Sequence, residues 1–204
     1  MANANRALCG AVFVSLLVPI AATAQRSRPS YGFGAGLTIP TGFFHNDGTG
    51  DGFNSGWEGM GLLEFKLPKT AIGVRFEGSY SQNSANDQLK AELSAAVGSP
   101  TDATVKILGG SVDLTYAFRS SSPAKAYLLA GIGMYNFKLA VSSGNTTVDT
   151  SKTKFTWNGG AGLSYRLGGA ALFLEARYFD MSAPFGGSDI KFVPIIAGVR
   201  FGGR

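Results

Sequence analysis

The sequence has little of several features that enzymes, disulfide-rich domains and nucleic-acid-binding proteins commonly use. The 204 residues include one cysteine, Cys9, and one histidine, His45. A single cysteine excludes a disulfide framework within the chain. Charged residues make up 15% of the sequence and the net charge is +5, whereas ordinary soluble domains are about 25% charged. The sequence contains no run of Lys and Arg that would indicate a nucleic acid partner.

The N-terminal segment has the features of a secretory signal peptide. Arg6 supplies a positive charge, Ala7–Ile20 is an apolar run of 14 residues, and small residues at positions 22 and 24 fit a cleavage site. This run is shorter than the roughly 20 residues that a spanning helix needs, which disfavours an N-terminal anchor. We therefore expect residues 1–24 to be removed, leaving residues 25–204 as one domain of 204 − 24 = 180 residues.

The rest of the chain also lacks any apolar run of about 18 residues, so a helical membrane span is excluded there. Glycine is abundant, with 29 residues, and aromatic residues make up 12% of the sequence. Only helices and closed β-barrels can satisfy backbone polar groups inside a bilayer. The composition therefore leaves a membrane barrel or a soluble β-structure.

Eight segments alternate between apolar and polar residues, which is typical of β-strands. These segments are Tyr31–Ile39, Trp57–Leu67, Ala71–Gln82, Thr104–Phe118, Ala124–Leu139, Lys154–Leu167, Ala171–Met181 and Lys191–Phe201. Each is long enough for a tilted membrane strand of about 9–11 residues. The fifth segment is apolar on both faces, and its orientation stays open.

Short and long connections alternate between these segments. The short ones are Pro68–Thr70, Arg119–Pro123 and Gly168–Ala170, and the long ones are Pro40–Gly56, Asn83–Ala103, Val141–Thr153 and Ser182–Ile190. Outer-membrane barrels have short periplasmic turns and long external loops. The sequence thus predicts an all-β, eight-stranded antiparallel up-and-down transmembrane β-barrel, with a soluble lipocalin-like barrel as the alternative.

The two faces of the strands predict two sets of functional side chains. The polar face predicts an ion-pair network in the lumen, made of Glu64, Lys66, Arg75, Glu77, Asp113, Arg166, Glu175, Arg177 and Arg200. The apolar face predicts aromatic girdles at the lipid–water boundaries, made of Tyr31, Trp57, Tyr80, Tyr116, Trp157, Tyr165 and Tyr178.

The first and last strands resemble those of a known family. Tyr31–Gly42 and Phe192–Phe201 are similar to the opening and closing strands of small bacterial outer-membrane barrels of the OmpA/OmpX-like group. The resemblance implies a place in the outer membrane, contact with its lipids, and external loops that can meet an extracellular ligand. It also implies that Phe201 is an assembly signal for the barrel-assembly machinery, and it implies no cofactor.

Three smaller patterns lie in the long connections or extend from them into the next strand. Asp47, Thr49, Asp51 and Glu58 have the spacing of a calcium loop, although Asp-Gly-rich segments are also common as plain turns. His45 has no serine or acid partner that the sequence can place beside it, so we expect a solvated loop residue. In Asp87–Val97 the apolar residues recur every fourth position, which leaves a short helix and an irregular loop equally open.

Three classes of function follow from these patterns. We expect a structural or surface-interaction barrel rather than an enzyme, because an eight-stranded lumen is just wide enough to be filled by its own side chains. A narrow porin-like channel for small solutes is the alternative, since inward glycines in the first strand would leave space. A barrel enzyme that modifies lipid A is the second alternative.

Overall fold

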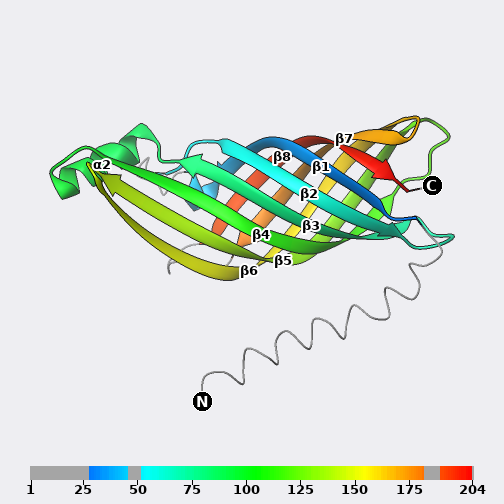
Figure 1. The fold of residues 1–204 in the computed structure, drawn as a ribbon, viewed down its shortest axis with the longest axis horizontal. Coiled ribbons are helices and arrows are strands. Elements are labelled where there is room, and N and C mark those ends of the chain that lie inside the picture. The colour runs from blue at the N-terminus through cyan, green and yellow to red at the C-terminus, as the bar shows by residue number, and fades with distance from the viewer. Residues whose placement is uncertain (1–27, 46–51, 182–188, 204) are drawn as a thin grey trace, which may run out of the picture.

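The structure is a computed structural model that describes residues 28–45, 52–181 and 189–203, and its strands close into a single antiparallel barrel (Figure 1). Neighbouring strands follow chain order from β1 to β8, and β8 pairs with β1. The strands are β1 Ser30–Thr41, β2 Gly56–Lys66, β3 Ile72–Ser84, β4 Thr101–Ala117, β5 Ala124–Ser143, β6 Thr146–Leu167, β7 Ala170–Met181 and β8 Ile190–Gly202. The predicted eight-stranded barrel is confirmed, and the predicted signal peptide lies outside the described residues.

The register fixes how strongly the strands are inclined. Starting from Leu37 in β1, pairing through β2, β3, β4 and β5 reaches Ser151 in β6. Pairing in the other direction, through β8 and β7, reaches Ala161 in the same strand. The register is therefore displaced by 161 − 151 = 10 residues around the closed barrel. With eight strands this displacement gives a tilt of roughly 45° and a narrow interior.

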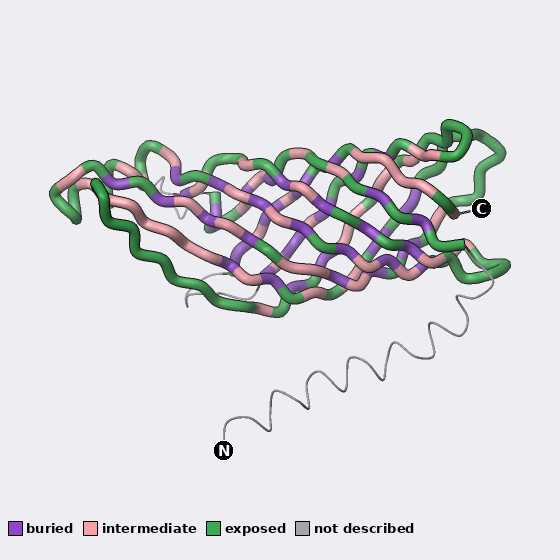
Figure 2. Tube along the Cα trace, in the orientation of Figure 1, coloured by how far each residue is buried: buried purple, intermediate pink, exposed green. Residues whose placement is uncertain are grey.

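Successive Cβ atoms of a strand point to opposite faces, so side chains within the barrel wall alternate between the lumen and the outside. Burial along the tube in Figure 2 alternates accordingly. In β3, for example, Arg75 and Glu77 are buried in the lumen, whereas Ile72 on the other face is exposed. Large apolar side chains, such as Phe33, Leu114 and Leu163, are among the most exposed in the molecule. This reverses the arrangement of a soluble barrel, which places its apolar face inward.

The fifth strand, whose orientation the sequence left open, has apolar residues on both faces for two different reasons. Tyr127, Leu129, Tyr135 and Phe137 are buried inside the barrel. The alternate positions, such as Ile132, are exposed on the outside. Both faces of β5 are thus apolar because one fills the lumen and the other lies on the outer surface.

One predicted loop is wrong. Val141–Thr153 is not an irregular connection, because β5 runs to Ser143 and β6 begins at Thr146. The two strands meet at the tight turn formed by Gly144, whose φ of 56° is left-handed, and Asn145. The polar Ser, Thr and Lys residues of this segment belong to a hairpin that projects past the rim.

The second long connection contains the helix α2, Asp87–Val97, so the helical alternative for this segment is confirmed. Asn86 caps its N-terminus by accepting a hydrogen bond from the Leu89 backbone N–H at 2.8 Å. Gly98 ends the helix with a left-handed φ of 77°. Among the described residues, no helix has the length and apolar character needed to cross a membrane.

The inward glycines of β1 are places of close approach. A Cβ atom on Gly36 would lie 1.9 Å from the Ile195 carbonyl oxygen of β8, and one on Gly34 would lie 2.7 Å from the Ile196 side chain. Gly61 in β2, by contrast, has no atom within 4 Å of its Cβ position. The glycines of β1 therefore allow the seam between the first and last strands to close, and large side chains occupy the space beside them.

Gly36→Ala is expected to destabilise the barrel, because the added methyl group collides with backbone at the β1–β8 seam. The expected loss is about 1–3 kcal/mol of unfolding free energy, measured by urea unfolding in detergent micelles. Gly61→Ala is the matched control and is expected to stay within about 0.5 kcal/mol of the parent. Equal stability of the two variants would contradict the close packing of this seam.

Candidate functional site

The most distinctive site of the molecule is a ladder of opposite charges buried in the lumen. We call it the charge ladder, and its members are Glu64, Arg75, Glu77, Asp113, Glu175, Arg177 and Arg200. They come from five strands, β2, β3, β4, β7 and β8. All seven belong to the set that the sequence predicted on the polar face.

Arg177 is the centre of the inner half of this ladder. Its guanidinium group contacts three carboxylates, those of Glu77, Asp113 and Glu175, and the contact to Asp113 is 3.2 Å long. The Arg177 side chain is only 4% exposed. A rigid guanidinium with five N–H donors suits such a site, since it can hold several carboxylates at once.

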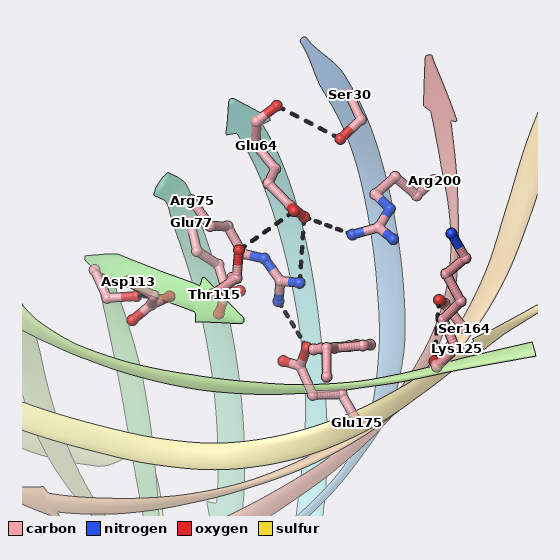
Figure 3. Close-up of polar contacts among 12 residues, drawn as sticks. Ser30, Glu64, Arg75, Glu77, Asp113, Thr115, Lys125, Ser164, Glu175 and Arg200 are labelled. Atoms are coloured by element: carbon pink, nitrogen blue, oxygen red, sulfur yellow. Dashed lines mark hydrogen bonds and ion pairs between the residues drawn. The ribbon is translucent and has the colours of Figure 1, made fainter. Parts of the chain in front are cut away.

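Arg75 connects the two halves of the ladder (Figure 3). Its Nη1 lies 2.6 Å from Glu175 Oε2, and its Nη2 lies 3.5 Å from Glu64 Oε2. Glu64 in turn accepts from Arg200 Nη1 at 2.5 Å. Positive and negative groups therefore alternate continuously from Arg200, near the short-turn end, to Arg177 in the middle of the barrel.

Neutral side chains complete the hydrogen bonding of the carboxylates. The Tyr127 hydroxyl donates to Glu175 at 2.7 Å, and Asn158 Nδ2 donates to Asp113 at 2.9 Å. The Ser111 hydroxyl donates to Asp113 at 3.0 Å. Buried charges are tolerated when they are paired and their remaining acceptors are satisfied. Period-two alternation places Ser111 and Asn158 on the polar faces of their strands, but it does not indicate which carboxylate each of them contacts.

Two predicted members of the network are corrected by the structure. Lys66 and Arg166 are exposed, and no ion pair among the described residues includes either of them. They lie at the short-turn end, where both line a small cavity of about 40 Å³ together with Arg200. Their positions at the strand ends place their side chains in the mouth of the barrel, within reach of water.

The position of Glu58 does not fit its predicted role as a calcium ligand. Sequence spacing made it the last ligand of a calcium loop, but it lies in β2 and its side chain is 3% exposed on the lumen side. The other three candidate ligands, Asp47, Thr49 and Asp51, lie outside the described residues. Within the part of the chain that the structure describes, no three His, Cys, Asp or Glu side chains are grouped to hold a metal ion.

An apolar cluster fills the lumen at the end with the long connections. We call it the apolar plug, and its buried members are Phe44, Val105, Ile107, Tyr135, Phe137, Phe179, Met181, Ile190 and Phe192. The rings of Phe179 and Phe192 are stacked with centroids 5.0 Å apart, and Tyr135 meets Phe179 edge-on at 5.6 Å. The lumen thus has two different fillings, a charged one and an apolar one.

A second buried apolar cluster lies beside the glycines of β1. It contains Met60, Leu62, Phe173 and Ile196. A Cβ on Gly198 would lie 2.4 Å from the Phe173 ring. The space that the inward Gly34 leaves is therefore occupied by the side chains of Ile196 and Phe173.

The predicted girdle residues all point outward and fall into two groups. One group, toward the long-connection end, consists of two ring pairs. The rings of Trp57 and Tyr80 have centroids 5.3 Å apart, and those of Trp157 and Tyr178 have centroids 5.6 Å apart. Tyr31, Tyr116 and Tyr165 lie toward the short-turn end.

The spacing of these groups fits a membrane band. Along β6, Trp157 and Tyr165 are 165 − 157 = 8 residues apart, which is about 27 Å along the strand and about 20 Å along the axis of a barrel tilted by roughly 45°. Membrane barrels have an apolar band about 25 Å tall between their girdles. Phe201, the predicted assembly signal, packs against Tyr31 with ring centroids 5.7 Å apart.

Three strands continue beyond the outer girdle and form what we call the projecting sheet. β5 and β6 pair up to Ser143 and Thr146, whereas β7 pairs with β6 only from Thr156 onward. β4 follows β5 as far as Thr101. In Figure 1 this sheet extends past the rest of the rim beside α2, and in Figure 2 the projecting part of β6 is exposed over residues 146–153. Lys154, closer to the rim, is half-buried.

His45, the sole histidine, lies at the end of the short 3-10 helix η1, Gly42–Phe44. It is exposed.

On the projecting sheet, Lys138 pairs with Asp149 and thereby holds the pKa of that carboxyl below its usual range.

Comparisons with known proteins agree with this architecture. The sequence model of the family described as outer membrane protein beta-barrel domain matches residues 10–201. The chain belongs to this family, and its place is the outer membrane of the cell. The predicted resemblance to small eight-stranded outer-membrane barrels is confirmed. A search among curated proteins gave no match.

Two solved structures illustrate the similarity. Neisserial surface protein A is 18% identical, with a TM-score of 0.57, and the alignment covers 86% of this chain and 96% of that one. A major outer membrane protein from Thermus thermophilus is 12% identical, with a TM-score of 0.62, and the alignment covers 87% of this chain and 99% of that one. At these identities the similarity concerns the fold.

Replacing Arg177 tests the charge ladder. Arg177→Met leaves three buried carboxylates without their shared partner, so we expect a loss of about 3–5 kcal/mol in unfolding free energy, measured by urea titration in detergent micelles. Arg166→Met removes an equal charge from the open mouth, and a change within about 0.5 kcal/mol is expected. Similar effects of both substitutions would mean that the ladder contributes little to stability.

Proposed function

We propose that this protein is a non-conducting surface barrel of the outer membrane, which presents its projecting sheet to negatively charged external partners. The observation that carries the proposal is the combination of a filled lumen with three strands that continue beyond the rim. The filled lumen favours an anchor over a pore, and the projecting sheet supplies a surface that the anchor holds outside the lipid.

The filling of the lumen argues against the porin-like alternative. A permeating ion would have to pass the apolar plug, where Phe179 and Phe192 are 1% and 2% exposed. It would then meet guanidinium and carboxylate groups that are already engaged with one another. Apolar constrictions exclude water from pores, and both fillings act in series along the same narrow lumen.

The projecting part of β6 has the properties of an interaction surface. Its residues 146–155 pair with β5 on one side and have no strand on the other among the described residues. An edge strand leaves backbone N–H and C=O groups available to other molecules. Val148 on this edge is 68% exposed, and a surface of this kind has no evident role in holding the barrel together.

The charge of this edge favours an anionic partner. Lys152 and Lys154 are separated by Thr153 and lie on the same face as Thr156, that is, on the face that continues the lumen side. Asp149, the one acid of the projecting part of β6, lies on the opposite face and is paired with Lys138. The face above the barrel mouth therefore carries two lysines with no acid beside them on the same strand.

The alternative of a lipid A-modifying enzyme has less support. The described residues contain one histidine, the exposed His45, and no acid or serine hydrogen-bonded to it. General acid–base and nucleophilic catalysis both require such a positioned partner. We therefore propose a non-catalytic role.

The refolded mature chain is expected to give no discrete current steps in a planar bilayer, because the plug and the ladder leave no water path. Insertion is verified in the same samples by the shift in gel mobility on boiling that folded barrels show. Steady, ohmic current from correctly inserted protein would contradict the non-conducting proposal and support the small-pore alternative.

Proteoliposomes carrying the protein are expected to adhere to a heparin-coated surface, and the adhesion is expected to weaken as salt rises. Lys152→Gln/Lys154→Gln should lower bound material roughly tenfold, since charges at the edge of an interface govern association. Lys106→Gln/Lys138→Gln, which removes the same charge from the opposite face of the projecting sheet, is the matched control. Equal adhesion of all three proteins would exclude this face as the binding surface.

A second variant tests the sheet itself. Deleting residues 140–143 and 146–149 joins Leu139 to Thr150 through the existing Gly144–Asn145 turn, because Leu139 and Thr150 are direct register partners. The barrel should still fold, as judged by its mobility shift. Adhesion should fall, because the exposed edge of β6 is shortened. Lys152 and Lys154 are kept, so the variant separates the effect of the edge from that of the two lysines. Full adhesion of the shortened protein would place the interaction elsewhere.

A further inference from the structure

Two lysines on the outer face of the projecting sheet lie directly opposite each other. Lys106 of β4 and Lys138 of β5 are register partners. Both point outward, because their chain neighbours Val105, Ile107 and Phe137 are buried inside the barrel. Like charges at directly opposed positions destabilise a sheet. Such a pair is stabilised when an anion lies between the two ammonium groups.

The height of this pair follows from the register. Trp57, Gln82, Lys106 and Lys138 lie on one continuous row of paired residues. The ten-residue displacement means that this row climbs toward the long-connection end as it passes from β2 to β5. Each step between strands rises by about 3.4 Å, because strands about 4.8 Å apart are tilted by roughly 45°. Lys106 and Lys138 are thus about 7 and 10 Å beyond the Trp57 level of the outer girdle.

The outer surface becomes apolar within two to four residues below the pair. Directly below Lys138 lies Asn136, which is the register partner of Leu108 and donates to the Thr153 hydroxyl at 3.1 Å. Leu108, two residues from Lys106, is 59% exposed, and Met134 of β5 is 55% exposed. Tyr80 of the outer girdle is paired in register with Leu108. A molecule that contacts both levels would have acyl chains against Leu108 and Met134 and an anionic headgroup at the height of the lysines.

The nearby acids do not neutralise the pair. Lys138 has one partner, Asp149, on the same outer face. None of the ion pairs formed by the described residues includes Lys106. Lys191, a third outward lysine near the outer girdle, is paired with Asp180 at 3.7 Å. The Lys106–Lys138–Asp149 group therefore keeps an excess of one positive charge where the membrane meets the outside.

From these observations we propose that Lys106 and Lys138 form a binding site for the phosphate-bearing headgroup of a glycolipid in the outer leaflet. The lysines bind the phosphate, and the apolar surface of β4 and β5 binds the acyl chains below it. Asp149 competes with the phosphate for Lys138 and so limits the affinity. The site is separate from the lysines at 152 and 154, which lie on the opposite face of the projecting sheet.

The test uses the full mature protein refolded in zwitterionic micelles and titrated calorimetrically with lipid A that carries two phosphates. Lys106→Gln/Lys138→Gln is expected to weaken binding about 25-fold, at about fivefold for each lysine near an anionic surface. Lys152→Gln/Lys154→Gln has the same change in net charge, and its affinity for lipid A is expected to stay within about twofold of the parent's. Asp149→Asn frees Lys138 and is expected to tighten binding severalfold.

Two further arms identify the source of the phosphate. Lipid A with one phosphate is expected to bind more weakly than the two-phosphate form, and inorganic phosphate at millimolar concentration is expected not to displace it. Undiminished binding by Lys106→Gln/Lys138→Gln would overturn the proposal. So would an equal loss in both double variants, which indicates general charge attraction, or displacement by inorganic phosphate, which indicates a site for free anions.

Discussion

The pairing of Arg177 with Glu77, Asp113 and Glu175 is the interaction on which the rest of the interior depends. Eight strands with a register displacement of ten residues enclose a narrow lumen, and charges placed there are stable only when their partners lie within reach. Arg177 draws together strands β3, β4 and β7, and Arg75 extends the contact to β2. The ladder therefore links parts of the chain that are far apart in sequence, as well as filling the lumen.

The two fillings of the lumen divide the molecule into parts with different roles. The charge ladder occupies the half toward the short turns, and the apolar plug closes the half toward the long connections. Outside, two aromatic groups bound a lipid-facing band. Beyond the outer group only β4, β5 and β6 continue as a sheet among the described residues. The proposed surface role rests on this division, in which a filled barrel holds the projecting sheet outside the lipid.

Much of this could be predicted from period-two alternation, since it assigns Arg75, Glu77 and Arg177 to one face and Trp57 and Trp157 to the other. Alternation carries no information about position along the axis. It therefore predicted Lys66 and Arg166 as members of the network. Both residues lie at strand ends, where the lumen meets water, and both are exposed. It also could not orient β5, where Phe137 fills the lumen and Ile132 lies on the outer surface. The polar residues 146–153 were assigned to a loop because a strand outside both lipid and core has no apolar face to reveal it.

The most direct test of a sealed lumen is chemical access to a residue within it. The chain after residue 24 contains no cysteine, so a single thiol can be introduced at Ser111, whose side chain is buried beside Asp113. In proteoliposomes, a charged, membrane-impermeant thiol reagent should leave Ser111→Cys unmodified from either side while it labels Val148→Cys on the exposed edge of β6. Rapid modification of the thiol at position 111 would show that water and ions reach the ladder, and would contradict the account of a closed barrel.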